Sequence, residues 1–258
     1  MLVRQPYLNP FRAVTTTKPA SKRLLVRRHL LALMGGGAAG VLAAGVPFAR
    51  AAQRTSSLAC VLRPQQIEGP YFVDEKLNRS DIRSDPKTRV VSQGVPLYLT
   101  FKVTRTEGSG CLPLNGALVD VWQCDAEGLY SDTDDFQENT RGFRFLRGYQ
   151  VTDRQGTASF TTIFPGWYPG RTVHIHFKIR VGAQGKATAG AKEFTSQIYF
   201  DDALTDAIHA QPPYSNRGPR KVRNNRDVVS LIGGSKLVLP LREEKKGYAG
   251  TFDVSLQM

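Results

Sequence analysis

Apolar and polar residues alternate over several short stretches, which is the pattern of strands with one buried face. In the clearest stretch, residues 97–104, leucine, phenylalanine or valine occupies every second position. Glycine, proline, aspartate and asparagine separate these stretches and mark the turns between them. Further strands are predicted at 117–124, 145–152, 157–164, 173–181, 194–200, 236–241 and 248–256.

The frequency of strands and the scarcity of helix indicate the fold class. Only residues 202–210 have a helical pattern, with Asp201 or Asp202 as the N-cap. Short strands without intervening helices favour an all-β protein, an antiparallel β-sandwich with little helix, over an α/β fold. We expect residues 96–258 to form this sandwich, and residues 52–95 to be an irregular segment that wraps the same domain.

The net charge of +13 is concentrated at the N-terminus. Residues 1–51 hold eight of the 35 lysines and arginines and no acidic residue, which leaves 27 basic against 22 acidic residues in 52–258. So small an excess gives the folded part no strong electrostatic attraction for nucleic acid. No nucleic-acid partner is therefore expected.

Residues 1–51 are typical of an export signal. Arg27-Arg28 precedes an uncharged run at 30–48 that is rich in alanine, glycine and leucine, and Ala49-Arg50-Ala51 fits a cleavage site. A paired arginine before a weakly hydrophobic run predicts the twin-arginine (Tat) route and a periplasmic or secreted protein. The run is long enough for a membrane anchor, but its composition is a poor one for a stable span.

Three cysteines lie outside the signal, and they include no C-x-x-C pair of the kind found in zinc ribbons and thioredoxin-like proteins. In an oxidising compartment one disulfide and one remaining thiol are expected. We prefer the pairing Cys60–Cys111 because Cys124 lies within a predicted strand, although the sequence leaves the other pairings open.

The strand predicted at 173–181 carries the first candidate chemistry. Its odd-numbered positions are all apolar, whereas His174 and His176 lie on the opposite face. Both imidazoles should leave the strand on that side, away from the core and roughly 7 Å apart, where they can share one metal ion. An H-x-H pair alone is more often a pair of surface histidines. The third histidine outside the signal, His209, falls in the predicted helix and is expected at the surface.

Tyr168 precedes a Pro169-Gly170 turn that can fold its phenol over the histidine face. A phenolate is a hard, anionic oxygen ligand that suits ferric iron. Tyrosine ordinarily titrates near about pH 10, so only a strong cation would hold it deprotonated. A single tyrosine here is more often a packed aromatic residue, but beside two histidines it points to an iron site.

These segments resemble those of the intradiol ring-cleavage dioxygenases, the family of the catechol and protocatechuate enzymes. Gly166–Phe177, GWYPGRTVHIHF, is similar to the family's iron-site segment, and Asp120–Ser131, DVWQCDAEGLYS, to the strand and loop of its first tyrosine ligand. The chain thus resembles an exported, short form of the family. Three further matches concern the hairpin between the tyrosines, a stretch that borders the pocket and a segment with an active-site glutamine: Phe145–Gly166, Gly69–Phe72 with Arg79–Asp81, and Thr195–Phe200.

The resemblance implies one Fe(III) ion per chain. Tyr130 and His174 would be its equatorial ligands and Tyr168 and His176 its axial ligands, with hydroxide in the fifth position. The implied reaction opens a catechol-type aromatic ring between its two hydroxyl groups with O2, incorporates both oxygen atoms and yields a muconate-type diacid. The iron would act as a Lewis acid and template.

The resemblance also assigns catalytic roles to Arg171 and Gln197. Arg171 matches the family's pocket arginine, which would stabilise negative charge that develops on the ring. Gln197 matches the family's active-site glutamine. Outside this context, Arg171 would be read as a solvated turn residue and Gln197 as a hydrogen-bonding residue of a strand.

Two departures limit what the resemblance carries over. The loop from Tyr168 to His174 is shorter than in the well-known catechol and protocatechuate enzymes, which reduces the pocket wall and leaves the substrate preference open. The helical N-terminal dimerisation region of the catechol branch has no counterpart, so the oligomeric state, including a homodimer, is also open.

Two other hypotheses compete with this interpretation. A non-catalytic β-sandwich of the same fold would use the histidine pair to hold zinc, copper or no metal, without phenolate ligands. A dioxygenase that cleaves beside the two hydroxyls generally uses two histidines and one carboxylate on Fe(II). No aspartate or glutamate lies in the segment 166–181, which disfavours that second hypothesis.

Overall fold

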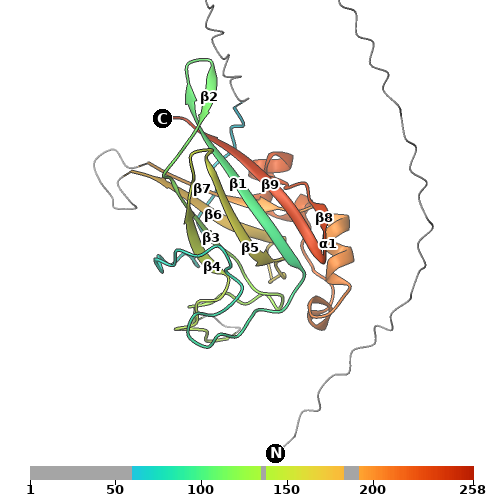
Figure 1. The fold of residues 1–258 in the computed structure, drawn as a ribbon. Coiled ribbons are helices and arrows are strands. Elements are labelled where there is room, and N and C mark those ends of the chain that lie inside the picture. The colour runs from blue at the N-terminus through green and yellow to red at the C-terminus, as the bar shows by residue number, and fades with distance from the viewer. Residues whose placement is uncertain (1–59, 135–137, 183–191) are drawn as a thin grey trace, which may run out of the picture. The chain divides into compact units, whose positions relative to one another are not determined.

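A computed structural model describes residues 60–134, 138–182 and 192–258 (Figure 1). The predicted export signal lies outside the described residues. The described chain forms a five-stranded and a four-stranded sheet. Among the described residues, no helix is both long enough and apolar enough to cross a bilayer.

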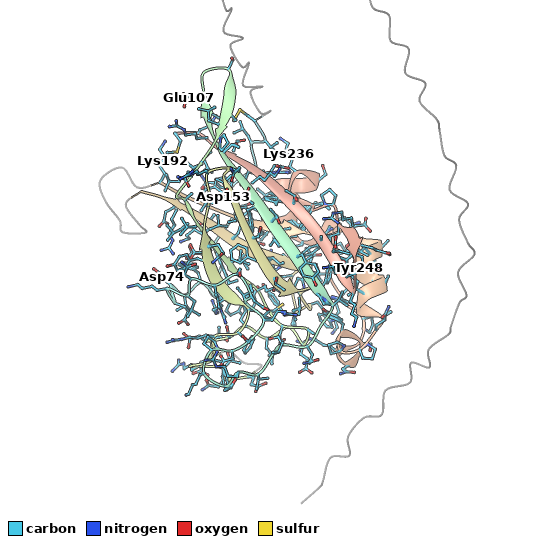
Figure 2. All side chains as sticks on the ribbon, in the orientation of Figure 1. Asp74, Glu107, Asp153, Lys192, Lys236 and Tyr248 are labelled. Carbon is cyan, nitrogen blue, oxygen red and sulfur yellow. A yellow bond between two sulfur atoms is a disulfide. The ribbon has the colours of Figure 1, made fainter. Side chains whose placement is uncertain are left out.

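The five-stranded sheet is built around its first strand. Its strands follow the order β2-β1-β9-β8, and β5 pairs with the N-terminal part of β1. Glu107 and Tyr248 mark opposite ends of this sheet in Figure 2. The pairing of β1 with β9 is parallel and the others are antiparallel, so this sheet departs from the purely antiparallel arrangement that was expected. The bounds are β1 (Pro96–Glu107), β2 (Gly110–Pro113), β5 (Thr157–Ile163), β8 (Arg242–Glu244) and β9 (Gly247–Leu256).

The four-stranded sheet carries the candidate site. Its order is β4-β3-β6-β7, with antiparallel pairing throughout. Each of its strands was predicted within a few residues of its ends. The bounds are β3 (Leu118–Trp122), β4 (Arg147–Val151), β6 (His174–Val181) and β7 (Lys192–Tyr199).

The core lies between the two sheets, which confirms the β-sandwich. Phe177 of β6 contacts Phe101 of β1 and Phe252 of β9, with ring centroids 5.2 and 5.4 Å apart. Its neighbours Ile175 and Ile179 are fully buried. The apolar face predicted for this strand therefore packs inward, and its register fixes the opposite face that carries the histidines.

The helices agree only in part with the prediction. The helix α1 (Asp202–His209) was expected, and the Asp201 carboxylate caps it by accepting from the Leu204 amide at 2.9 Å. A second helix, α2 (Val228–Gly233), was not expected. Three short 3₁₀ helices are also present: η2 (Tyr214–Arg217), η3 (Asn224–Arg226) and η4 (Gly234–Leu237).

One strand prediction was wrong, and two short strands, β2 and β8, were not predicted. Residues 236–241 form the end of η4 and an extended segment that makes only an isolated bridge, between Val238 and Tyr199. This segment reads as a strand because its apolar side chains are buried, but most of its backbone lies outside the sheets. The short strand β2 was missed because only Cys111 of its four residues is buried.

Residues 60–95 contain isolated bridges and turns and no named strand. A disulfide joins Cys60 at the start of this segment to Cys111 in β2, with Cα atoms 5.4 Å apart. Cys124 is a buried free thiol. The preferred pairing is therefore confirmed, because Cys124 is enclosed beyond the end of β3.

Candidate metal centre

The four side chains predicted as ligands converge from three segments of the chain. His174 and His176 begin β6, Tyr130 follows β3, and Tyr168 lies in the loop between β5 and β6. The Tyr168 hydroxyl is 3.2 Å from Nε2 of His174, which is 3.0 Å from Nε2 of His176. The Tyr130 ring lies 5.7 Å from the Tyr168 ring and 6.1 Å from the His176 ring, between centroids.

These separations fit donor atoms that share one ion. Two metal–ligand bonds of about 2.0–2.2 Å at roughly a right angle place their donor atoms about 3 Å apart. The His174 Nδ1 lies 2.7 Å from the Thr172 carbonyl, which can only accept. Nδ1 therefore carries the proton of the neutral ring, and Nε2 presents its lone pair to the site.

Burial keeps the imidazoles neutral in the absence of a cation. It lowers the pKa of His174 to about 3, and the positive charge of Arg171 acts in the same direction. It also lowers the pKa of His176 well below its usual value, with smaller contributions from His174 and Arg171. Neutral imidazoles are the form that binds metal ions.

The two phenols are protonated unless a strong cation is present. Burial raises the pKa of Tyr130 well above 10, and the nearby Tyr168 adds to this effect. Burial also raises the pKa of Tyr168, against the opposing charge of Arg171. The buried Tyr130 hydroxyl makes no hydrogen bond, and such a group costs about 1–3 kcal/mol unless it finds a partner. A cation among these four donors would supply that partner.

The donor set is specific in its chemistry. Among the residues that the structure describes, no three His, Cys, Asp or Glu side chains are grouped to hold a metal ion. The oxygen donors beside the two histidines are the phenols of Tyr130 and Tyr168. A set of hard, anionic phenolates and imidazoles suits ferric iron better than it suits the divalent ions that prefer carboxylate ligands, such as Mg²⁺ and Ca²⁺.

The histidine face lies opposite the core, as expected, and it is nevertheless buried. His174 is 2% exposed and His176 is 1% exposed. Residues 66–72, which we call the strap, cover this face. The strap is held by a hydrogen bond from Gln197 Nε2 to the Ile67 carbonyl (3.0 Å) and by an ion pair between Glu68 and Lys178.

Two aromatic residues of the strap complete the surroundings of the centre. Tyr71 stacks on Tyr130 with ring centroids 4.3 Å apart and an interplanar angle of 21°. Phe72 packs on Trp122, which in turn stacks on His176 at 5.0 Å. The strap therefore limits the access of water to two of the four candidate ligands, Tyr130 and His176.

Gly69 brings the backbone of the strap close to His176. Its φ of 77° lies in the left-handed region, and a Cβ there would be 3.3 Å from Cε1 of the imidazole. A side chain at this position would be strained and would press on the ring.

A buried arginine joins the strap to the loop of Tyr130. Arg147 of β4 donates from Nε to the Ser131 hydroxyl (2.9 Å) and carbonyl (3.1 Å), and from Nη1 to the Tyr71 carbonyl. It is 2% exposed. Because Ser131 follows Tyr130 directly, this guanidinium fixes both the loop of Tyr130 and the ring that stacks on it.

The two residues predicted to be catalytic contact each other. Arg171 donates from Nη2 to Oε1 of Gln197 at 2.6 Å and from Nε to the Asp227 carboxylate at 2.9 Å. The Tyr199 hydroxyl lies 2.9 Å from the same Gln197 oxygen. Arg171 is thus held beside the four donors, and its charge reaches all of them, as the pKa shifts of His174 and of the phenols show.

Comparison with known proteins places this geometry in a family. A family model described as dioxygenase matches residues 67–230. The protocatechuate 3,4-dioxygenase beta chain of Burkholderia cepacia is 30% identical over 197 residues, which cover 73% of this chain and 76% of that one. The chain belongs to the intradiol ring-cleavage dioxygenase family. Members of this family are oxidoreductases, so the chain is an enzyme of that class.

Other intradiol dioxygenases agree with this assignment. The catechol 1,2-dioxygenase of Candida albicans is 39% identical over 147 residues, which cover 50% of this chain and 41% of that enzyme. An intradiol ring-cleavage dioxygenase from Tetranychus urticae superposes with a TM-score of 0.65 at 33% identity, over 77% of this chain and 95% of that chain. The dioxygenase domain of a carbohydrate-binding fusion protein from a Streptomyces species superposes with a TM-score of 0.51 at 29% identity, over 76% and 99% of the two chains.

Three residues of this intradiol site were not identified from the sequence. Asp227 follows a basic run with no motif, and Arg147 lies in a hairpin that was noted only as a whole. Tyr71 belongs to the GPYF segment, whose resemblance to a pocket-bordering stretch was a usable signal. The prediction for His209 was wrong: it is 6% exposed, its Nε2 donates to the Pro165 carbonyl at 3.0 Å, and its ring stacks on Tyr214.

Proposed function

We propose that this intradiol dioxygenase binds one ferric ion through Tyr130, Tyr168, His174 and His176 and cleaves a catechol-type ring with O2. The observation that carries the proposal is the convergence of two phenols and two neutral imidazoles in a buried position. The donor atoms of Tyr168, His174 and His176 follow one another at 3.2 and 3.0 Å, and the Tyr130 ring lies beside those of Tyr168 and His176. The proposed product is a muconate-type diacid that contains both oxygen atoms.

When bound, ferric iron supplies Lewis-acid chemistry and a template for the two substrate oxygens. Arg171 keeps its Nη1 group outside the hydrogen bonds to Asp227 and Gln197, so that group is available to orient a substrate oxygen. Tyr168 is the most exposed of the four donors, and its phenolate oxygen can accept a proton from an incoming catechol. The strap excludes water from Tyr130, on which Tyr71 stacks, and from His176.

We further propose that the enzyme is exported by the twin-arginine route and acts in the periplasm or outside the cell. The disulfide between Cys60 and Cys111 supports this proposal, because stable disulfides are rare in the reducing cytosol. The route also carries folded proteins, so the iron can be inserted before export.

The test is a ring-cleavage assay of iron-loaded protein with catechol, protocatechuate and hydroxyquinol under ¹⁸O₂. We expect at least one of these substrates to yield an open-ring diacid that carries two labelled oxygen atoms. His176→Gln should abolish the reaction, whereas His209→Gln, a matched change of a buried histidine outside the site, should retain it. A product with an aldehyde group, or no oxygen uptake with any catechol, would reject the proposal.

A further inference from the structure

We propose that Asp227 is a positioning residue for Arg171, and that the short helix α2 is therefore part of the active-site framework. This inference rests on the proposed function, because it deepens the role of Arg171 in that reaction. Asp227 lies about 50 residues along the chain from the ligand-bearing strand, and no motif of the sequence singles it out.

Asp227 is 1% exposed, and the two oxygens of its carboxylate accept hydrogen bonds from two different segments. Oδ2 accepts from Arg171 Nε at 2.9 Å and from the Thr172 amide at 2.8 Å. Oδ1 accepts from the amides of Val229 and Ser230, at 2.8 and 3.1 Å, and so caps α2. The carboxylate is thus fixed from both sides.

Capping alone does not explain this arrangement. Asp201 caps the longer helix α1 with one oxygen that accepts from Leu204, and none of the described arginines forms an ion pair with its carboxylate. In Asp227 the second oxygen is directed at the loop that enters β6. A carboxylate buried in this way is stable only if it is paired, and Arg171 supplies the pairing charge.

The contact determines where the free edge of Arg171 lies. The guanidinium is planar, so fixing Nε on Asp227 and Nη2 on Gln197 also fixes Nη1. A preorganised cation is effective only if it does not have to reorient as charge develops on the substrate. Asp227 therefore contributes to catalysis through the orientation of Arg171, without touching substrate.

The same carboxylate supports one of the proposed ligands. It holds the Thr172 amide, and the Thr172 carbonyl accepts from Nδ1 of His174. The connection from α2 to His174 therefore runs from the Asp227 carboxylate through the backbone of Thr172, which it holds by the amide, to the imidazole that donates to the carbonyl of the same residue. Residues that orient ligand histidines in this way typically change metal affinity or activity by about 10–100-fold when they are lost.

The experiment is a double-mutant cycle with Asp227→Ser and Arg171→Gln. Serine retains an N-cap oxygen for α2 but is too short to reach Arg171. We expect Asp227→Ser to lower kcat by roughly ten- to a hundredfold, the value of one charge-assisted hydrogen bond. In the Arg171→Gln background Asp227→Ser should lower kcat by less than about threefold, because the guanidinium that Asp227 positions is already absent. Asp201→Ser is the matched cap control and should keep the wild-type kcat.

A second readout does not depend on activity. In the wild type, the Arg171 Nε–H should appear in a ¹⁵N NMR spectrum as a slowly exchanging signal, and it should be lost in Asp227→Ser. Multiplicative losses in the double mutant, or an unchanged Nε–H signal, would overturn the inference. If the wild type cleaves no catechol, the proposed function fails, and the NMR signal still decides whether Asp227 positions Arg171.

Discussion

The buried guanidinium of Arg147 provides a quantitative prediction about how the site is held. Arg147→Met removes the donor of three acceptors: the carbonyl and hydroxyl of Ser131 and the carbonyl of Tyr71. Each buried acceptor left unpaired costs about 1–3 kcal/mol, which gives about 3–9 kcal/mol for the three. Because losses above about 5 kcal/mol are exceptional for one substitution, we expect the lower part of this range, about 3–5 kcal/mol, in the free energy of unfolding. With about 2–4 °C per kcal/mol in a domain of this size, the Tm should fall by about 10 °C.

The loss should reach the metal centre, because Ser131 is covalently joined to Tyr130. We expect about tenfold weaker iron binding by Arg147→Met at a temperature where the protein is folded. Arg79→Met is the matched control: Arg79 also donates to backbone carbonyls, those of Ser84, Arg144 and Arg147, but touches neither the strap nor Ser131. It should lower the Tm and leave iron affinity unchanged. Equal iron affinity in the two variants would refute the reasoning.

Three further predictions concern separate parts of the domain. Burial raises the pKa of Asp125 from 3.8 to about 6, so its proton stabilises the fold below about pH 4 and that stabilisation is lost as the pH rises through about 6. As the pH rises from about 5 to 7, the Tm of Asp125→Asn should therefore fall less than that of the wild type. Asp153 also lies in a turn and accepts from two amides, and the Tm of the control Asp153→Asn should change with pH as the wild type does. Gly69→Ala should lower the free energy of unfolding by about 1–2 kcal/mol through backbone strain, and it should also weaken iron binding. Gly116 has a similar left-handed φ but open space around it, so Gly116→Ala should lower the stability by a similar amount and leave iron binding unchanged. Cys111→Ser should destabilise by about 4 kcal/mol in urea unfolding, from the entropy of the closed loop, and an unchanged unfolding midpoint would contradict this.

The ligand-bearing strand was predictable because two independent signals coincide in it. The apolar positions of β6 recur with a period of two, which fixes the face of His174 and His176 before any tertiary contact is known. Tyr168 and Tyr130 followed from segments similar to those of a known family. Local pattern and motif therefore sufficed for the β-sandwich and for the meeting of the four side chains.

The surroundings of the centre were not predictable, because they arise from contacts between distant residues. The strap covers the histidine face through pairs such as Glu68 with Lys178, which are far apart in sequence. The helix α2 has only six residues, and because Val228, Leu231 and Ile232 are exposed, its sequence shows no amphipathic pattern. The helix begins where the Asp227 side chain caps it. Periodicity cannot register either kind of contact.

The visible absorption spectrum of the iron-loaded protein tests the central claim most directly. Tyrosinate bound to ferric iron produces an intense red ligand-to-metal charge-transfer band, and we predict this band with one iron per chain. Tyr130→Phe and Tyr168→Phe should each weaken or shift it, whereas Tyr149→Phe in β4, away from the four donors, should leave it intact. A colourless protein, or iron whose spectrum is the same in all three variants, would contradict the assignment of the phenols as ligands.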